Sequence, residues 1–534
     1  MSTVNDASPS PRRTRIVLPV LLALSLVAAA CNPPGGDGDG SAGSSPTEVG
    51  ATDIEPEFVE DPGCFGLEPD DAEQLECGTV EVPLDHDAPD EGSAQLAVVV
   101  DEAADTDGGQ APLLVLGGGP GEVLVEPYLT TPQQRQVFAA SRTTIIIDQR
   151  GVGSSDPALT CPELPALEVQ ESAVADIDAA IEATGECRER LVDEGVDLDA
   201  YNHLANARDI EVVRRALGYD QLNVRGTSYG TQVALLAAEM FPESVRSVVL
   251  SSPLDPRTNW MQELPGGFAQ ALDRLTTACA QDAACTDQVG DLREAIEETV
   301  ERLDEKPQEV TAQPPGGETT TLTYTPSRFL DGLSAFFYQP QLTAMLPAVV
   351  DRAHDGDLTP MATIVACYEQ RTEGSLAAGM QQSMLCTGEA GLLDPQAALA
   401  DVDDELIAGH WYPQTMYGAP AEEFCESWDV EQIYDPSEIS LDTEVPTLVV
   451  TGEFDHVTPP HLGEQVHDAL PASHLIEVPQ AVHGPLEGLS LPGTGTCGQG
   501  IVTDFLDDPG RAPDAGCAAD FALQLGTPLP PGLG

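Results

Sequence analysis

The residues best suited to carry out chemistry form a Gly-x-Ser-x-Gly pattern in the middle of the chain. Gly226–Gly230 places Ser228 between two glycines, after apolar residues typical of a short strand and before an Ala- and Leu-rich stretch that predicts a helix. A strand, a tight turn and a helix in this order present a serine hydroxyl beside the first N–H groups of the helix. We therefore predict that Ser228 is a nucleophile. A glycine-rich turn that only caps a helix is the alternative, unless a base and an acid are found.

A nucleophilic serine needs a general base, and the base needs an acid to orient it. Asp455 follows an apolar strand predicted over residues 446–450, and His483 follows the last predicted strand, residues 474–478. Of the nine histidines, His483 is the one in a loop directly after that strand, with Gly484 beside it. We predict that His483 is the base and Asp455 the acid, while capping of the next turn is the alternative role for Asp455.

A glycine-rich loop earlier in the chain is suited to hold a developing negative charge. Gly117–Gly121 follows a buried strand predicted over residues 112–116, and glycines let backbone N–H groups approach an alkoxide without side chains in the way. We predict an oxyanion hole formed by the N–H groups of Tyr229 and of Gly118 or Gly119. A simple turn after the strand is the alternative.

Strands and helices alternate along much of the chain, as they do in α/β proteins with a mostly parallel sheet. The predicted strands are residues 77–84, 94–100, 112–116, 144–148, 222–224, 245–251, 446–450 and 474–478. The strand pattern stops after residue 252, and amphipathic helical stretches follow. With the position of Ser228, this pattern predicts an α/β-hydrolase fold with a large, mainly helical lid inserted after the strand that follows the nucleophile helix.

We expect the chain to divide into five parts, because 534 residues exceed one simple core. These are a signal peptide (1–31), a disordered linker (32–57), the first part of the hydrolase core (58–252), the lid (253–441) and the second part of the core (442–534).

The N-terminal segment has the features of an export signal. Arginines within residues 12–15 precede the apolar residues 16–30, and Cys31 follows three alanines. Small residues directly before a cysteine resemble a bacterial lipobox, which predicts a lipid on Cys31; ordinary cleavage nearby is the alternative, because Ala28 stands where leucine is usual. We expect an exported protein, either a lipoprotein on the outer face of the cytoplasmic membrane or a secreted protein.

The cysteines agree with export to an oxidising compartment. Eleven follow Cys31, and neighbours along the chain predict five disulfides: Cys64–Cys77, Cys161–Cys187, Cys279–Cys285, Cys386–Cys425 and Cys497–Cys517. Cys367 remains as the expected unpaired thiol. The spacing of the cysteines and histidines predicts no metal site.

Charge excludes one class of partner. The chain has 90 acidic and 22 basic residues, a net charge of −68, which argues against nucleic acid because phosphate binding needs clustered Lys and Arg. A soluble, self-repelling surface explains this composition. Adaptation to high salt, which would screen the repulsion, is the sharper hypothesis.

A combination of segments carries a resemblance to a known family, from about residue 60 to about residue 520. The segments are Cys77–His86, Gly118–Gly121, Asp148–Gly153, Gly226–Thr231, Phe241–Glu243, Gly452–Asp455, His483–Gly484 and, in the lid, Cys386 with Cys425–Trp428. With these segments the chain resembles the proline iminopeptidase and tripeptidyl aminopeptidase (TAP-like) family of α/β-hydrolases, in particular its exported bacterial members. The resemblance implies Ser228, Asp455 and His483 as the triad, a TAP-like C-terminal segment, and cleavage of peptides from a free N-terminus.

Aminopeptidases of this family bind the substrate ammonium group with lid carboxylates. The resemblance makes four glutamates candidates for this role: Glu389, Glu422, Glu423 and Glu426. A solvated surface charge is the alternative for each of them in so acidic a chain.

The chain also departs from the family pattern. Gly117 stands where members have His or Pro, Glu122-Val123 stands where small residues are usual, and Ser251-Ser252 replaces a common Asp-Gly. These departures leave the detail of the oxyanion loop and the substrate preference open.

We predict a serine hydrolase without a cofactor, most simply an exported aminopeptidase of the proline or tripeptidyl type that acts through an acyl-enzyme. A carboxylesterase with the same triad is the first alternative, and a non-catalytic surface lipoprotein is the second. The sequence does not indicate an oligomeric state.

Overall fold

The computed structural model describes residues 56–67, 75–102, 110–138, 142–164, 177–314, 317, 319–372, 374–490 and 496–530, with only the backbone of Gln133. The predicted signal peptide, the lipid site at Cys31 and almost all of the predicted linker lie outside these residues. Within the described residues, no helix combines the length and apolar character needed to cross a membrane.

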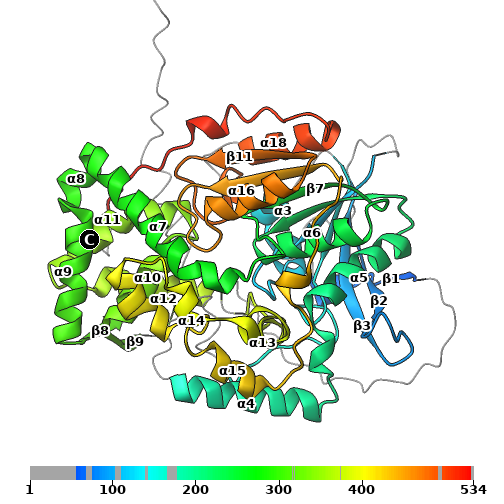
Figure 1. Ribbon diagram of the computed structural model, residues 1–534, viewed down its shortest axis with the longest axis horizontal. Coiled ribbons are helices and arrows are strands. Elements are labelled where there is room, and N and C mark those ends of the chain that lie inside the picture. Colours follow the sequence, from blue (N-terminus) through cyan, green and yellow to red (C-terminus); the bar gives the residue numbers. More distant parts are fainter. Residues whose placement is uncertain are drawn as a thin grey trace, which may run out of the picture.

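The centre of the described structure is a nine-stranded sheet with the spatial order β1-β2-β3-β5-β4-β6-β7-β10-β11 (Figure 1). The strands are β1 (Phe58–Glu60), β2 (Leu75–Pro83), β3 (Ser93–Asp101), β4 (Leu113–Leu116), β5 (Thr144–Ile147), β6 (Leu222–Thr227), β7 (Val245–Ser251), β10 (Thr447–Gly452) and β11 (Ser473–Val478). Neighbours from β5 to β11 are parallel, whereas the pairs that involve β1, β2 or β3 are antiparallel. The predicted mostly parallel sheet is confirmed.

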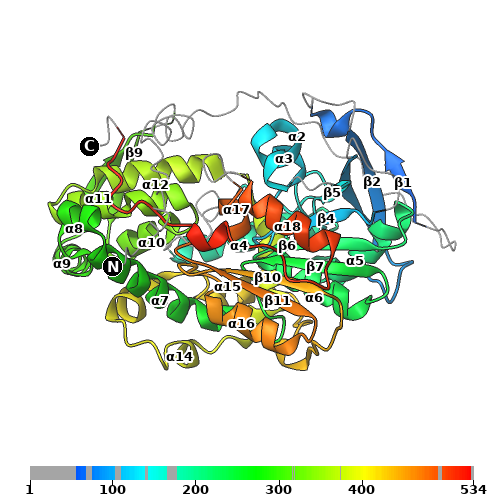
Figure 2. The same cartoon turned by 90° about the horizontal axis from the view of Figure 1, so that it is seen from above.

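Both faces of the sheet are covered. Successive side chains of a strand point to opposite faces, so each strand contributes to an apolar core on either side. In β5, Ile145 and Ile147 belong to one apolar core and Ile146 to another. The helices α5 (His203–Ala216), α6 (Tyr229–Met240) and α16 (Pro460–Ala469) pack in the first core, and α2 (Val125–Thr130), α17 (Pro485–Gly488) and α18 (Cys497–Asp507) in the second (Figure 2). A sheet buried on both faces explains why its strands read as continuous apolar runs.

Between β7 and β10 the chain forms the mainly helical region that the sequence predicted. Its longer elements are α7 (Trp260–Gln281), α8 (Ala283–Val289), α9 (Leu292–Glu305), β8 (Gln308–Ala312), β9 (Thr320–Tyr324), α10 (Pro326–Phe336), α11 (Pro340–His354), α12 (Thr359–Thr372), α13 (Ala378–Thr387) and α15 (Ala421–Trp428). In Figure 1, α8–α12 lie to the left of the sheet. Their apolar core also contains Phe454 and Val482, the neighbours of Asp455 and His483 in the chain. The inserted region is therefore packed directly against the loops that carry these two residues.

All five predicted disulfides are present: Cys64–Cys77, Cys161–Cys187, Cys279–Cys285, Cys386–Cys425 and Cys497–Cys517. The expectation that Cys367 is an unpaired thiol is wrong. Cys367 is disulfide-bonded.

Candidate active site

The strand–turn–helix at Ser228 has the strained geometry that its glycines predict. Ser228 lies between β6 and α6 with φ 55° and ψ −125°, a region that residues other than glycine rarely adopt. A Cβ at Gly226 would lie 2.3 Å from the carbonyl oxygen of Gly230, and a Cβ at Gly230 would lie 2.6 Å from that of Gly117. Only glycine fits at these two positions. The tight turn that the glycines allow places the serine side chain just beyond the end of the strand.

The predicted acid and base meet at the same edge of the sheet. Asp455 follows β10 and His483 follows β11, and Nδ1 of His483 lies 2.9 Å from Oδ1 and 3.0 Å from Oδ2 of Asp455. The Asp455 carboxylate also accepts hydrogen bonds from the backbone N–H groups of Val457 and Thr458 and from the Thr458 hydroxyl. Burial alone would raise the pKa of Asp455, but His483 above all, with the Ser252 hydroxyl and His456, lowers it to about 2. Asp455 is therefore a charged, fixed partner for the imidazole.

Ser252, which lies where the chain departs from the family pattern, supports the acid and the base, a role that the sequence did not indicate. The Ser252 hydroxyl donates to Oδ2 of Asp455 at 2.5 Å and accepts from the backbone N–H of Gly484 at 2.9 Å. One side chain thus holds the acid and the loop of the base together. Ser252 has φ 57°, so the backbone there is constrained as well.

A second link joins the loop after His483 to the nucleophile strand. The Glu487 carboxylate accepts from Arg225 at 2.5 Å, from the Thr227 hydroxyl at 2.9 Å and from the Ser251 hydroxyl at 2.6 Å. Burial raises the pKa of Glu487, but Arg225 and these bonds bring it below its usual value. Glu487 was missed at the sequence level because nothing local distinguishes it among the many acidic residues of this chain.

The glycine-rich loop lies against the serine. A Cβ at Gly118 would be 3.1 Å from Cβ of Ser228, so this glycine allows the close approach that an oxyanion donor needs. Gln149 donates to the Gly117 carbonyl at 3.1 Å, and Asn206 bonds both Gln149 and the Tyr229 hydroxyl at 3.0 Å. This buried network ties the loop to the residue after the nucleophile. The structure thus brings Gly118 and Tyr229 to Ser228, while their role as oxyanion donors stays a prediction.

The four candidate glutamates for substrate binding have different surroundings. Glu389 is completely buried, accepts from Gln232 at 3.0 Å and lies 3.4 Å from Nε2 of His203. Burial raises its pKa, yet His203 and Gln232 bring the pKa below its usual value, so Glu389 is an internal paired charge. The other three, Glu422, Glu423 and Glu426, are exposed on α15, which packs on α4 (Ile177–Asp193) and α13. In the part of the chain that the structure describes, no recorded bond connects any of the four to the triad residues.

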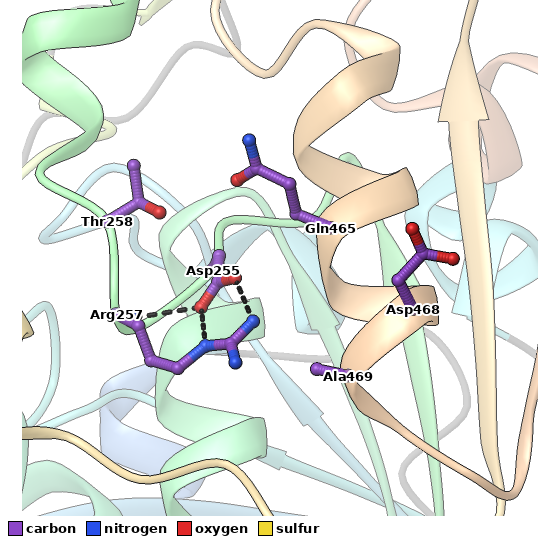
Figure 3. Close-up of a pocket in the computed structure, with 6 residues that line it drawn as sticks. All are labelled: Asp255, Arg257, Thr258, Gln465, Asp468 and Ala469. Carbon is purple, nitrogen blue, oxygen red and sulfur yellow. Dashed lines mark hydrogen bonds and ion pairs between the residues drawn. The ribbon is translucent and has the colours of Figure 1, made fainter.

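Two other places in the described residues have features of a binding site. A groove of about 510 Å³ between the segment after β7 and α16 is lined by Asp255, Arg257, Thr258, Gln465, Asp468 and Ala469 (Figure 3). Its one arginine is already paired with Asp255, and it contains no triad residue. The possible ligand atoms of Cys161, Glu163 and Cys187 lie within 4.8 Å of one another, but the two cysteines form a disulfide and offer no thiolate to a metal ion.

Comparisons with known proteins agree with the fold. Residues 111–310 match the family model described as alpha/beta hydrolase fold, and residues 413–517 match the model described as TAP-like protein. The chain is therefore an α/β-hydrolase. Its C-terminal part belongs to the TAP-like proteins, as the resemblance predicted.

Three relatives are similar over different lengths. Serine protease Hip1 of Mycobacterium tuberculosis is 28% identical over 426 residues, which is 75% of this chain and 80% of the relative. Tripeptidyl aminopeptidase of Streptomyces lividans is 29% identical over 203 residues, 35% of this chain and 37% of the relative. Carboxylesterase B of Mycobacterium tuberculosis is 29% identical over 222 residues, 39% of this chain and 42% of the relative.

Proposed function

We propose that this protein is a serine aminopeptidase that releases residues from the free N-terminus of peptides, with Ser228, His483 and Asp455 as its triad. The observation that carries this proposal is the pairing of Nδ1 of His483 with the buried Asp455 beside the strained Ser228 turn. The pairing keeps a proton on Nδ1, so Nε2 is the nitrogen that has a lone pair for the serine proton.

The reaction follows from these positions. His483 takes the proton of Ser228 Oγ as the oxygen attacks the scissile carbonyl, and Asp455 stabilises the imidazolium. The oxyanion is held by the N–H groups of Tyr229 and of Gly118 or Gly119. The tetrahedral intermediate collapses when His483 gives its proton to the leaving amine. Water, activated by the same histidine, then releases the acyl group.

Peptide substrates are supported by the TAP-like match and by relatives named serine protease and tripeptidyl aminopeptidase. The inserted region between β7 and β10 packs against the loops of Asp455 and His483, where a lid would limit access to small chain ends. We take residues 253–441 as this lid and residues 58–252 and 442–534 as the core.

Export is part of the same proposal. The disulfides are typical of an oxidising compartment, and the N-terminal sequence has an export signal that ends at Cys31. We place the enzyme outside the cytoplasmic membrane, held by a lipid on Cys31 or secreted.

The test is to compare the purified protein with its Ser228→Ala variant on aminoacyl- and tripeptidyl-naphthylamides with free and acetylated N-termini. We expect cleavage only of the free substrates, with a loss of at least about 10⁴-fold in the variant. A p-nitrophenyl ester serves as the control. The identity to carboxylesterase B favours an esterase as the second candidate, and Ser228-dependent turnover of the ester alone would decide for it. Turnover of neither class would indicate a binding protein.

A further inference from the structure

One acidic side chain in the glycine-rich loop lies beside the candidate nucleophile. Oε2 of Glu122 accepts a hydrogen bond of 2.6 Å from the backbone N–H of Gly118. A Cβ placed at Gly118 would lie 3.4 Å from this oxygen and 3.1 Å from Cβ of Ser228. The Glu122 carboxylate therefore lies within a few ångströms of the site where the scissile carbonyl must bind.

The charge of Glu122 is poorly compensated. None of the recorded ion pairs among the described residues involves Glu122. By contrast, Glu487, the carboxylate whose charge raises the pKa of Glu122, is paired with Arg225. Burial raises the pKa of Glu122 most, and Glu487 adds to this, against the lowering effects of the Gly118 N–H and of His483. A partly buried carboxylate without a cation of its own is costly, and a cation bound next to it would remove that cost.

The hydrogen bond to Glu122 also occupies Gly118, one of the two candidate oxyanion donors of this loop. A backbone N–H has one hydrogen, so while it donates to Glu122 it cannot donate fully to an oxyanion. A carboxylate left beside the oxyanion would also repel it. Gly118 can therefore act as an oxyanion donor only after Glu122 has exchanged its partner.

The backbone around Glu122 is held in place, so this exchange needs only a side-chain rotation. The N–H of Val123 donates to the Ser375 carbonyl at 2.8 Å, and the N–H of Ala377 donates to the Gly121 carbonyl at 2.9 Å. These bonds fix the residues on both sides of Glu122 to the segment that leads into α13.

We propose that Glu122 binds the α-ammonium group of the substrate's N-terminal residue, exchanging the Gly118 N–H for this cation. The Gly118 N–H, a candidate oxyanion donor, is then released when a free N-terminus is bound. This inference rests on the proposed aminopeptidase function. It makes Glu122 the residue that recognises the free N-terminus of the substrate. None of the lid glutamates considered above is needed for that role.

The position of Glu122 also specifies the length of the released unit. In an aminoacyl substrate, the ammonium group is attached to the carbon next to the scissile carbonyl, within reach of a carboxylate at Gly118. In a tripeptidyl substrate it lies two residues further away, roughly 7 Å. The geometry therefore favours release of single amino acids.

The experiment compares the wild type, Glu122→Gln and Glu122→Ala on alanyl-naphthylamide, its N-acetyl derivative and a free tripeptidyl-naphthylamide. Both variants should lower the ratio of kcat/KM for the free to the acetylated alanyl substrate by about 100-fold, because an ion pair is lost. In Glu122→Ala, cleavage of the acetylated substrate should also rise, since the Gly118 N–H is free. Glu126→Gln, an exposed charge change four residues along, is the matched control and should change neither rate.

The outcomes separate this inference from the proposed function. If the wild type cleaves the free alanyl substrate and the variants keep its free-to-acetylated ratio, Glu122 does not bind the ammonium group, and the aminopeptidase stands. Cleavage of the tripeptidyl substrate alone also overturns the inference without overturning the aminopeptidase. A wild type that cleaves no free-amine substrate overturns both.

Discussion

The two sides of Ser228 are built differently. On the acid–base side, Asp455 is bonded to His483, Ser252 and Thr458, and Glu487 joins the loop of His483 to Arg225 in the nucleophile strand. On the oxyanion side, the Glu122 side chain accepts a single recorded hydrogen bond, from the Gly118 N–H, and has no recorded ion pair among the described residues.

The difference corresponds to two tasks. A triad acid must keep its charge and position through every step, which a saturated set of hydrogen bonds provides. A group that meets the substrate must be able to change partner, and a carboxylate with a single donor can do so by rotation of its side chain. The acid–base side is therefore expected to respond to mutation through kcat, and the oxyanion side through substrate discrimination.

The largest effect is expected on the acid–base side. Asp455→Asn keeps the shape of the side chain but no longer holds a proton on Nδ1 of His483, so kcat should fall by about 10⁴-fold with little change in KM. Steady-state kinetics on the substrate identified above measures both parameters. The control is that the variant is folded and keeps the KM of the wild type. A loss of kcat below 10-fold would contradict the assigned role of Asp455.

How much of the fold and of the candidate site was predictable from the sequence depends on how far apart in the chain the interacting residues lie. The triad and the oxyanion loop follow local patterns, namely glycines around a serine and polar residues directly after apolar strands. The five disulfides join cysteines at most 39 positions apart, with no other cysteine between the two partners. Cys367 lies nearer to Cys386 than Cys425 does, so sequence order alone did not separate these three cysteines, and the prediction that Cys367 is unpaired was wrong.

The supporting residues could not be found in this way. The bond from Ser252 to Asp455 spans 203 positions and that from Ser251 to Glu487 spans 236. These contacts exist only because β7, β10 and the loop after β11 meet at one edge of the sheet. The only sequence signal was the departure of Ser251-Ser252 and Glu122 from the family pattern, and both departures lie beside Ser228 or Asp455 in the structure.

A second prediction concerns pH and stability on the same side. The pKa of Asp455 is lowered from 3.8 to about 2, so its ionised form stabilises the folded state. This contribution, about 2 kcal/mol, is fully present above about pH 5 and is lost as the pH falls from there through about 2. The difference in free energy of unfolding between the wild type and Asp455→Asn, measured with urea at several pH values, should shrink by this amount. A difference independent of pH would show that the carboxylate gains nothing from its partners.

The smallest effect separates positioning from stability. Ser252→Ala removes the hydroxyl that joins Asp455 to Gly484, so the imidazole loses part of its orientation, and kcat should fall by about 10-fold. Ser247→Ala is the matched control, because the Ser247 hydroxyl is equally buried and bonds Asn223 at 2.7 Å within the sheet, away from the triad. Both variants should lose about 1–2 kcal/mol in free energy of unfolding. If they also lose the same activity, Ser252 acts through stability alone, and the acid–base side is less specifically organised than its hydrogen bonds indicate.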